Sequence, residues 1–375
     1  MKQDISSKKT LIEQVRDAAN SEKNRTRGLL RPAANFAMEE PIAWTRIFGF
    51  DANRYLTDPE FYFEQTLRQK LWRWENFPDE DLPIAPDLPA WLGHYPEYTF
   101  VGLDVSFNSR GVPDIQTDHP LTRDPKVGLL NPVDFKTSGW MSRVLRWYDD
   151  LVKISAGRIN VPFNMTWTRG CLDLAIALRG YENFVSDTVE RPQFVHDLFT
   201  FLVEQRCRWW EDYYRHFGLK PEPVGISDDW INIPFISPEM FADFVLPQYL
   251  EIERFHGGLP KVHSCGNQTP VQKYLLQIRS LSTLEVSPWT DLTQTLANVP
   301  PEKHLAVALH PNDVLCATSE QMEAKLRLVA DSCRDRSYGI GTSGLTPLTE
   351  DISEFVSKIN TWTSVVKKVL NQSKS

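Results

Sequence analysis

The residues with the clearest potential for chemistry lie where short apolar runs of the sequence end. His263 and Cys265 stand two positions apart at the end of one such run, and Glu285 lies at the same depth in the next. Side chains at positions i and i+2 of a strand point to the same side, so an imidazole and a thiol can reach one ion. The sequence therefore predicts a zinc site formed by His263, Cys265 and Glu285. A small buried thiol beside a hydrogen-bonded histidine would give the same short pattern without a metal.

Two adjacent acids, Asp228 and Asp229, follow the preceding apolar run. Carboxylates at such a position bind substrate or transfer protons, although acids in loops also cap turns. We predict a catalytic role for both. Four further residues that close apolar runs are predicted to bind substrate: Asp104, Asn164, Trp167 and Ser343.

The spacing of apolar residues indicates the scaffold that must position these side chains. From residue 158 onward, six apolar runs are each followed by a segment with helical periodicity, and the earlier runs 41–48 and 98–107 are predicted as two further strands. Alternation without hairpins is typical of a parallel sheet. No G-x-G-x-x-G turn follows a strand, which disfavours an open nucleotide-binding sheet. The sequence therefore predicts an α/β fold, a single (β/α)₈ TIM-type barrel, whose catalytic residues lie at the carboxyl ends of the strands.

The same patterns suggest how the chain is divided. Residues 1–34 are predicted to form an N-terminal helical extension, and residues 35–375 the barrel. Residues 108–140 are rich in Asn, Asp, Gly and Pro, which predicts a long loop that covers the site. The helix expected over 238–256 has Ser237 as its N-cap and Pro238 in its first turn.

The charge and cysteine content exclude several classes of protein. The net charge is −8 and no run of Lys or Arg occurs, so nucleic acid is not an expected partner. No apolar stretch approaches the roughly 20 residues that span a bilayer. The N-terminus lacks the apolar core of a secretory signal, so we expect a cytoplasmic protein. Five cysteines in 375 residues indicate free thiols or metal ligands rather than a disulfide framework.

Several segments between Asn164 and Ser353 resemble the uroporphyrinogen decarboxylase superfamily, closest to its cobalamin-linked zinc methyltransferase branch. In chain order they are RGYENFVSDTVERPQFVHDLF, the Asp228–Asp229 pair, ISPEMFADFVLPQYLEI, KVHSCGNQTP and GTSGLTPLTEDI. The resemblance implies that His263 and Cys265 match the H-x-C zinc ligands of that branch, and that Glu285 matches a glutamate ligand of some members. Those relatives add a late cysteine, where this chain has Ser343.

The resemblance also implies partners. The methyl donor would be methylcobalamin or, as an alternative, a folate or another activated methyl compound. A separate corrinoid protein would carry the cobalamin, because this chain has no evident D-x-H-x-x-G cobalamin motif. A homodimer and a small-molecule substrate are further expectations from the family.

Three functions follow as hypotheses. The first is a zinc-dependent methyltransferase that moves a methyl group between a corrinoid and a thiol or related small acceptor. The second is a metal-independent lyase or decarboxylase of the same superfamily that acts on a small carboxylated or aromatic substrate, with His263 as general acid and base. The third is a non-catalytic, ligand-binding barrel, which the acids at the strand ends argue against. Uroporphyrinogen is disfavoured as substrate, because the arginine-rich stretch of the decarboxylases is reduced to Arg46.

Overall fold

The computed structural model describes residues 2–29, 32–116 and 118–372. The strands are β1 (Ala33–Ala34), β2 (Asp104–Phe107), β3 (Pro113–Gln116), β4 (Ile226–Ser227), β5 (Lys261–His263), β6 (Thr283–Val286), β7 (His304–Leu309) and β8 (Tyr338–Thr342). The α-helices are α1 (Lys2–Asn20), α2 (Glu22–Arg25), α3 (Ile42–Phe48), α4 (Ala52–Tyr55), α5 (Pro59–Asn76), α6 (Pro96–Phe100), α7 (Met141–Ser155), α8 (Cys171–Arg179), α9 (Tyr181–Glu190), α10 (Pro192–Phe217), α11 (Pro238–Met240), α12 (Leu246–His256), α13 (Gln272–Leu275), α14 (Leu292–Asn298), α15 (Asn312–Leu315), α16 (Ser319–Ser332) and α17 (Ile352–Gln372). Short 3-10 turns are η1 (Pro120–Thr122), η2 (Val127–Leu129) and η4 (Thr269–Val271), and η3 (Phe241–Val245) is π-helical.

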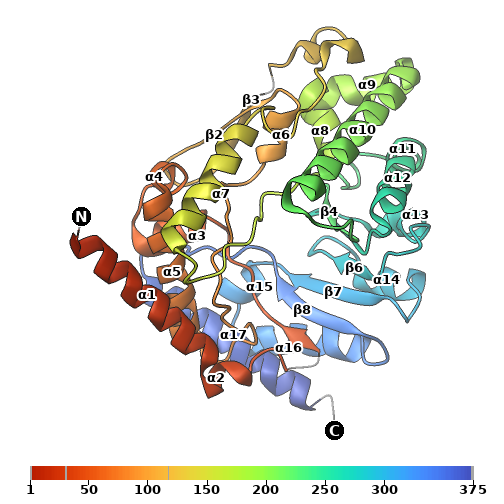
Figure 1. The fold of residues 1–375 in the computed structure, drawn as a ribbon. Coiled ribbons are helices and arrows are strands. Elements are labelled where there is room, and N and C mark those ends of the chain that lie inside the picture. The colour runs from red at the N-terminus through yellow and green to blue at the C-terminus, as the bar shows by residue number, and fades with distance from the viewer. Residues whose placement is uncertain (1, 30–31, 117, 373–375) are drawn as a thin grey trace.

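Six of the strands form one parallel sheet in the order β1-β8-β7-β6-β5-β4 (Figure 1). Two segments continue this order beyond β4 through isolated parallel bridges: residues 160–169 pair with β4 at Ser227, and residues 87–90 pair with residues 160–163. The six strands and these two segments supply the eight parallel positions of a (β/α)₈ barrel. The predicted fold class is confirmed.

The barrel has a seam between β1 and residues 87–90, because the described residues show no backbone pairing there. Helix α5 bridges the seam with side chains from one face. Tyr62 donates a hydrogen bond of 2.7 Å to the carbonyl oxygen of Pro89, and Arg73 donates one of 2.7 Å to that of Phe36. The two edges are thus joined through a helix instead of a backbone ladder.

The strand predicted over 41–48 is wrong, since this segment is helix α3. Trp44 and Phe48 lie one helical turn apart, and both pack against Trp72 with ring centroids 5.9 and 6.2 Å away. Gly49 ends the helix in the left-handed conformation, with φ of 67°. A short apolar run fits a strand or a buried helix equally well, so only tertiary packing decides. The first barrel strand is instead β1, which lies inside the segment 1–34 expected to be an extension.

The strand predicted over 98–107 is also wrong as a barrel strand. Residues 96–100 form α6, and β2 pairs with β3 as an antiparallel hairpin outside the parallel sheet. The second barrel position is taken by residues 87–90 instead. The loop predicted over 108–140 is interrupted by β3 and by the 3-10 turns η1 and η2, and its other described residues lie outside helices and strands.

The helix predicted over 238–256 is present and begins at the expected cap. Ser237 accepts a hydrogen bond of 3.1 Å from the backbone N–H of Met240. The π-helical segment η3 interrupts the helix just before Pro247, which has no N–H to continue the ladder. Gly257 then ends α12 in the left-handed conformation.

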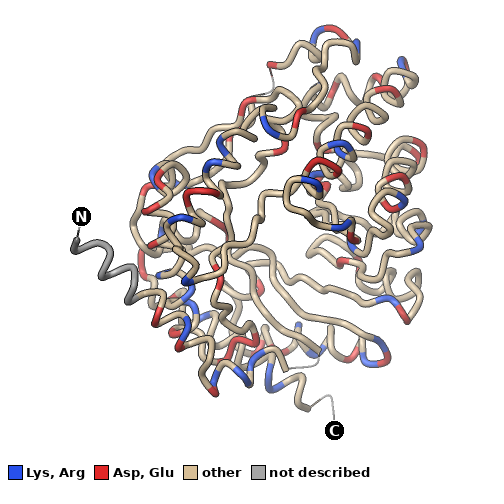
Figure 2. The backbone as a smooth tube through the Cα atoms, viewed as in Figure 1, with Lys and Arg blue, Asp and Glu red and all other residues tan. Residues whose placement is uncertain are grey.

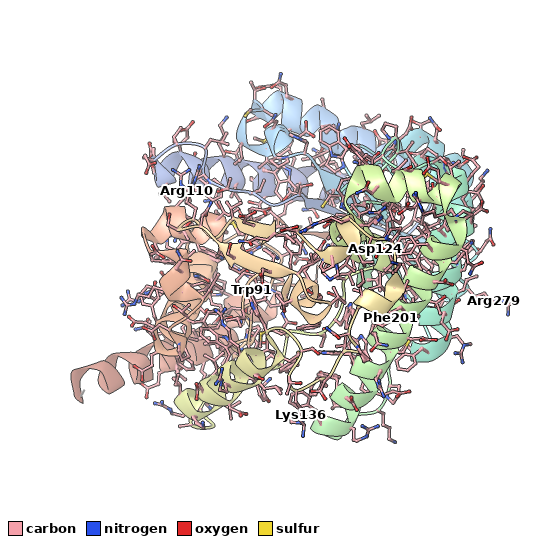
Figure 3. All side chains as sticks on the ribbon, turned by 90° about the horizontal axis from the view of Figure 1, so that it is seen from above. Trp91, Arg110, Asp124, Lys136, Phe201 and Arg279 are labelled. Atoms are coloured by element: carbon pink, nitrogen blue, oxygen red, sulfur yellow. The ribbon has the colours of Figure 1, made fainter. Side chains whose placement is uncertain are left out.

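The two signs of charge are interspersed over the molecule, with no large patch of one sign on view (Figure 2). Seen from above, Lys136 and Arg279 extend from the periphery (Figure 3). The N-terminal helix α1 packs along α5. Among the described helices, none combines the length and the apolar character required to cross a bilayer.

Candidate metal centre

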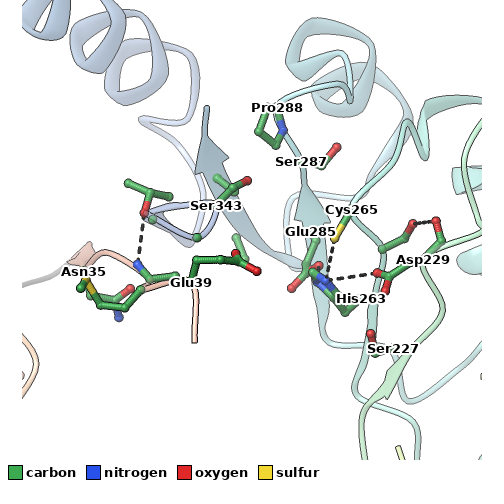
Figure 4. A pocket seen from close by; sticks show the side chains of 18 of the residues that line it. Asn35, Glu39, Ser227, Asp229, His263, Cys265, Glu285, Ser287, Pro288 and Ser343 are labelled. Carbon is green, nitrogen blue, oxygen red and sulfur yellow. Dashed lines mark hydrogen bonds and ion pairs between the residues drawn. The ribbon is translucent and has the colours of Figure 1, made fainter. Parts of the chain in front are cut away.

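Three side chains of types that can bind a metal ion converge at the carboxyl ends of β4 and β5 (Figure 4). One donor atom from each of Asp229, His263 and Cys265 lies within 4.8 Å of the other two. Nε2 of His263 is 3.5 Å from the sulfur of Cys265 and 3.7 Å from Oδ1 of Asp229. That oxygen is buried and makes no hydrogen bond within the described chain.

The strand register explains why these residues meet. β4 and β5 are parallel, and Ser227 lies opposite His263. Asp229 and Cys265 each follow two residues later, in the turns that leave the two paired strand ends. The N–H of Asp228 donates a hydrogen bond of 2.9 Å to the carbonyl oxygen of His263, which ties the two strand ends together.

Glu285 holds the other edge of the His263 ring. Its Oε2 lies 2.5 Å from Nδ1 of His263, and its Oε1 lies 2.5 Å from the ammonium group of Lys261. Burial lowers the pKa of His263, but Cys265 and Glu285 outweigh burial and raise that pKa to about 10. Burial likewise acts to raise the pKa of Glu285, yet His263 and Lys261 bring it below its usual value. Glu285 thus orients the imidazole so that Nε2 faces Asp229 and Cys265.

Arg169 holds Asp229 in the same way. Its guanidinium nitrogen Nη1 lies 2.8 Å from Oδ2 of Asp229 and 2.6 Å from Oδ2 of Asp173. Burial raises the pKa of Asp229, but the charges of Arg169 and His263 outweigh it, so the pKa lies below its usual value. The carboxylate is therefore ionised at neutral pH, with one oxygen paired and the other turned toward the cluster.

The cluster lines one wall of a cavity of about 630 Å³ inside the barrel mouth. The opposite wall carries small side chains at alternate positions of β7 and β8: Ala306, Ala308, Gly339 and Gly341. Barrel interiors are usually filled by branched side chains, so these small residues leave the lumen open. The cavity can hold a small molecule against the three donor atoms.

Comparison with known proteins assigns the chain to a family. The sequence model for uroporphyrinogen decarboxylase (URO-D) matches residues 98–360, more than half of the chain. The chain belongs to the URO-D family. No curated protein sequence matches it.

A solved structure supports the barrel of this URO-D family member. A methyltransferase from Methanosarcina mazei superposes with a TM-score of 0.60, over 90% of this chain and 93% of that chain. Because the two sequences are 12% identical, this likeness establishes the shared fold alone.

The four predicted substrate-binding residues of this URO-D family chain lie in different parts of the structure. Ser343 lines the cavity, on the wall across from His263 (Figure 4). Asn164 lines a separate cavity of about 420 Å³ beside α5. Trp167 is fully buried and packs against Phe100, with ring centroids 5.7 Å apart. Asp104 lies on the exposed edge of the β2–β3 hairpin. Of these four residues, only Ser343 lines the cavity beside His263 and Cys265.

Two cavity residues escaped the sequence analysis. Arg169 is the last residue of the barrel segment 160–169, where it pairs with Ser227, and including the charged residue at that end of the segment would have found it. Tyr95 lines the cavity from the start of α6, and its ring stacks on the Arg169 guanidinium at 4.5 Å. No local sequence pattern marks Tyr95, since it reaches the cavity through an unusual backbone conformation.

Asp228 corrects the expectation that both adjacent acids act on substrate. It is fully buried and lies outside the cavity lining. Its carboxyl group accepts hydrogen bonds from the N–H groups of Leu172 and Asp173, at 3.2 and 2.8 Å, and from the hydroxyl of Tyr249 at 2.8 Å. Burial, together with the neighbouring Asp173, raises the pKa of Asp228 well above its usual value. Asp228 therefore joins the start of α8 to β4 and α12.

We expect Asp228→Ala to destabilise the protein by about 2–5 kcal/mol, because it leaves two buried N–H groups without acceptors. Asp228→Asn keeps one acceptor and the side-chain volume, so its loss should be smaller. Urea unfolding followed by circular dichroism measures both. Equal stability of Asp228→Ala and the wild type would contradict the structural role.

Proposed function

We propose that the chain is a zinc-dependent methyltransferase that moves a methyl group between a corrinoid and a thiol or related small acceptor. The observation that carries the proposal is the convergence of Asp229, His263 and Cys265, whose donor atoms all lie within 4.8 Å of one another. Oδ1 of Asp229 is buried without a hydrogen bond in the described chain. The charged neighbour of this oxygen is Nε2 of His263 at 3.7 Å, beyond hydrogen-bond distance, and a bound cation would compensate the missing hydrogen bond more closely.

The donor set fits zinc. A thiolate, an imidazole and a carboxylate are its usual ligands, and three protein ligands leave a fourth position for substrate. In this proposal the third zinc ligand is Asp229, whereas the sequence analysis predicted Glu285 as the third ligand. Glu285 instead supplies the carboxylate that accepts the Nδ1–H of His263, which sets the tautomer of a metal-ligating histidine.

Zinc bound to these residues would deprotonate a coordinated thiol and so make it a nucleophile at neutral pH. The residues of the chain prepare this chemistry. Arg169 keeps Asp229 ionised, so one thiolate and one carboxylate balance the charge of the ion. The open lumen beside Ala306 and Gly339 provides room for the acceptor.

The proposed methyl donor is methylcobalamin carried by a partner protein. Pro288 lines the cavity, and the adjacent Trp289 has 61% of its surface exposed. An exposed aromatic residue beside the entrance suits contact with a partner that delivers a large cofactor. The structurally similar protein from Methanosarcina mazei is a methyltransferase, which agrees with this reaction class.

The first test is metal content. Protein purified without chelator should carry close to one zinc per chain, and Cys265→Ser should lose it while keeping the fold, because the ion lies at the barrel rim. Cys316→Ser is the matched control, since Cys316 is also an exposed free thiol but lies outside the cavity. Elemental analysis of the three proteins decides: zinc retained in Cys265→Ser contradicts the site.

A second pair of variants separates the ligand from the residue that orients it. Asp229→Ala should abolish zinc binding, whereas Glu285→Gln should weaken it by about 10- to 100-fold, as is typical of partners of metal-bound histidine. Competition with a fluorescent chelator gives both affinities. The reverse order of the two effects would restore Glu285 as the third ligand.

Uroporphyrinogen should not be a substrate. Its decarboxylation in the family depends on several arginines, and the described cavity lining has one arginine and no lysine. That arginine, Arg169, is already paired with two carboxylates. Incubation with uroporphyrinogen should therefore yield no coproporphyrinogen by fluorescence chromatography, and measurable product would overturn this expectation.

The competing hypothesis is a metal-independent lyase with His263 as general acid and base. The hydrogen bond between Nδ1 of His263 and Glu285 favours it, because a carboxylate orients an imidazole for proton transfer as well as for metal binding. Wild-type protein without zinc would support the lyase over the methyltransferase.

A further inference from the structure

Tyr95 has a backbone conformation that its residue type rarely adopts. Its φ of 69° is in the left-handed region, and the only other non-glycine residue with a positive φ in the described chain is Ala156, at the end of α7. For a bulky side chain this conformation is unfavourable and persists only where the surroundings enforce it. Glycine would adopt this backbone conformation without strain. The presence of tyrosine instead therefore suggests that its side chain has a role.

The conformation places that side chain in the wall of the cavity. Tyr95 lines the same cavity as His263 and Cys265. Its ring covers the guanidinium of Arg169 at 4.5 Å, and Arg169 in turn binds the proposed zinc ligand Asp229. The residue thus borders the reacting centre although it comes from the start of α6.

The hydroxyl of Tyr95 is available to a ligand. It makes no hydrogen bond within the described chain, and the residue is only half-buried. Burial raises the pKa of Tyr95, so the hydroxyl keeps its proton at neutral pH and acts as a donor. A phenol that is partly removed from water usually has a hydrogen-bond partner.

We propose that Tyr95 is a substrate-binding residue whose hydroxyl donates a hydrogen bond to an oxygen of the methyl acceptor. This inference rests on the proposed function and narrows the acceptor to a small, uncharged thiol that also carries a hydroxyl or carbonyl oxygen. An anionic acceptor is disfavoured because Glu39, Asp229 and Glu285 line the cavity, while its one arginine is already paired.

The test compares two thiols that differ in one group. 2-Mercaptoethanol ends in a hydroxyl where 1-propanethiol ends in a methyl group. Binding of each to the zinc-loaded full chain is measured by titration calorimetry, together with zinc content. Tyr95→Phe should lose about three- to tenfold in affinity for 2-mercaptoethanol, the range expected for one hydrogen bond, and keep its affinity for 1-propanethiol.

Tyr98→Phe is the matched control. Tyr98 also faces Arg169, with its ring 5.9 Å from the guanidinium, but it lies outside the cavity lining. It should leave both affinities unchanged. Tyr95→Leu, which removes the ring as well, reveals whether stacking on Arg169 supports zinc binding.

Three results would overturn the proposal: unchanged discrimination between the two thiols in Tyr95→Phe, the same loss in Tyr98→Phe, or tighter binding of mercaptoacetate than of 2-mercaptoethanol. Each of them leaves the zinc site standing if zinc content is unaltered. Absence of zinc from the wild type would instead refute the proposed function, and with it the role of Tyr95.

Discussion

The buried positive charge of Arg169 is the constraint on which the geometry of the site depends. Its side chain is 10% exposed, and a guanidinium stays protonated in a protein interior. A charge in such a place requires carboxylate partners, because water cannot solvate it. Asp173 from α8 and Asp229 beyond β4 supply them. The carboxylate of Asp229 is thereby fixed: one oxygen is paired with Arg169, and the other faces His263 and Cys265.

A second chain of charges fixes the imidazole. Lys261 and His263, two residues apart on β5, both bind the carboxylate of Glu285 from β6. One oxygen serves each partner, so the ring cannot turn without breaking an ion pair. The two charge networks approach the cluster from opposite sides. They hold its donor atoms in place before any ligand binds, which is a condition for precise chemistry.

The barrel combines this rigid wall with an open interior. Alanine and glycine of β7 and β8 line the cavity, while Leu305 and Leu309 of β7 are buried and lie outside its lining. The small side chains inside the barrel therefore leave its lumen open as a cavity. At the seam beside β1, α5 carries hydrogen bonds that strand pairing supplies elsewhere. The same arrangement that stabilises the barrel from outside makes room for substrate within it.

The sequence by itself determined what depends on local spacing. Residues two apart on a strand share a side, so the pairing of His263 with Cys265 could be predicted, as could the cap at Ser237 and the parallel barrel implied by alternating strands and helices. Only the tertiary structure decided which carboxylates join them. Asp228 and Asp229 are adjacent in sequence, yet one is locked among backbone N–H groups and the other faces the cavity. The helical state of residues 42–48 could not be predicted, because it depends on packing against Trp72, which is distant in sequence. The position of Arg169 near a strand end could be predicted, but its pairing with Asp229 could not. Spacing along one element fixes directions, whereas burial and register between elements fix which groups meet.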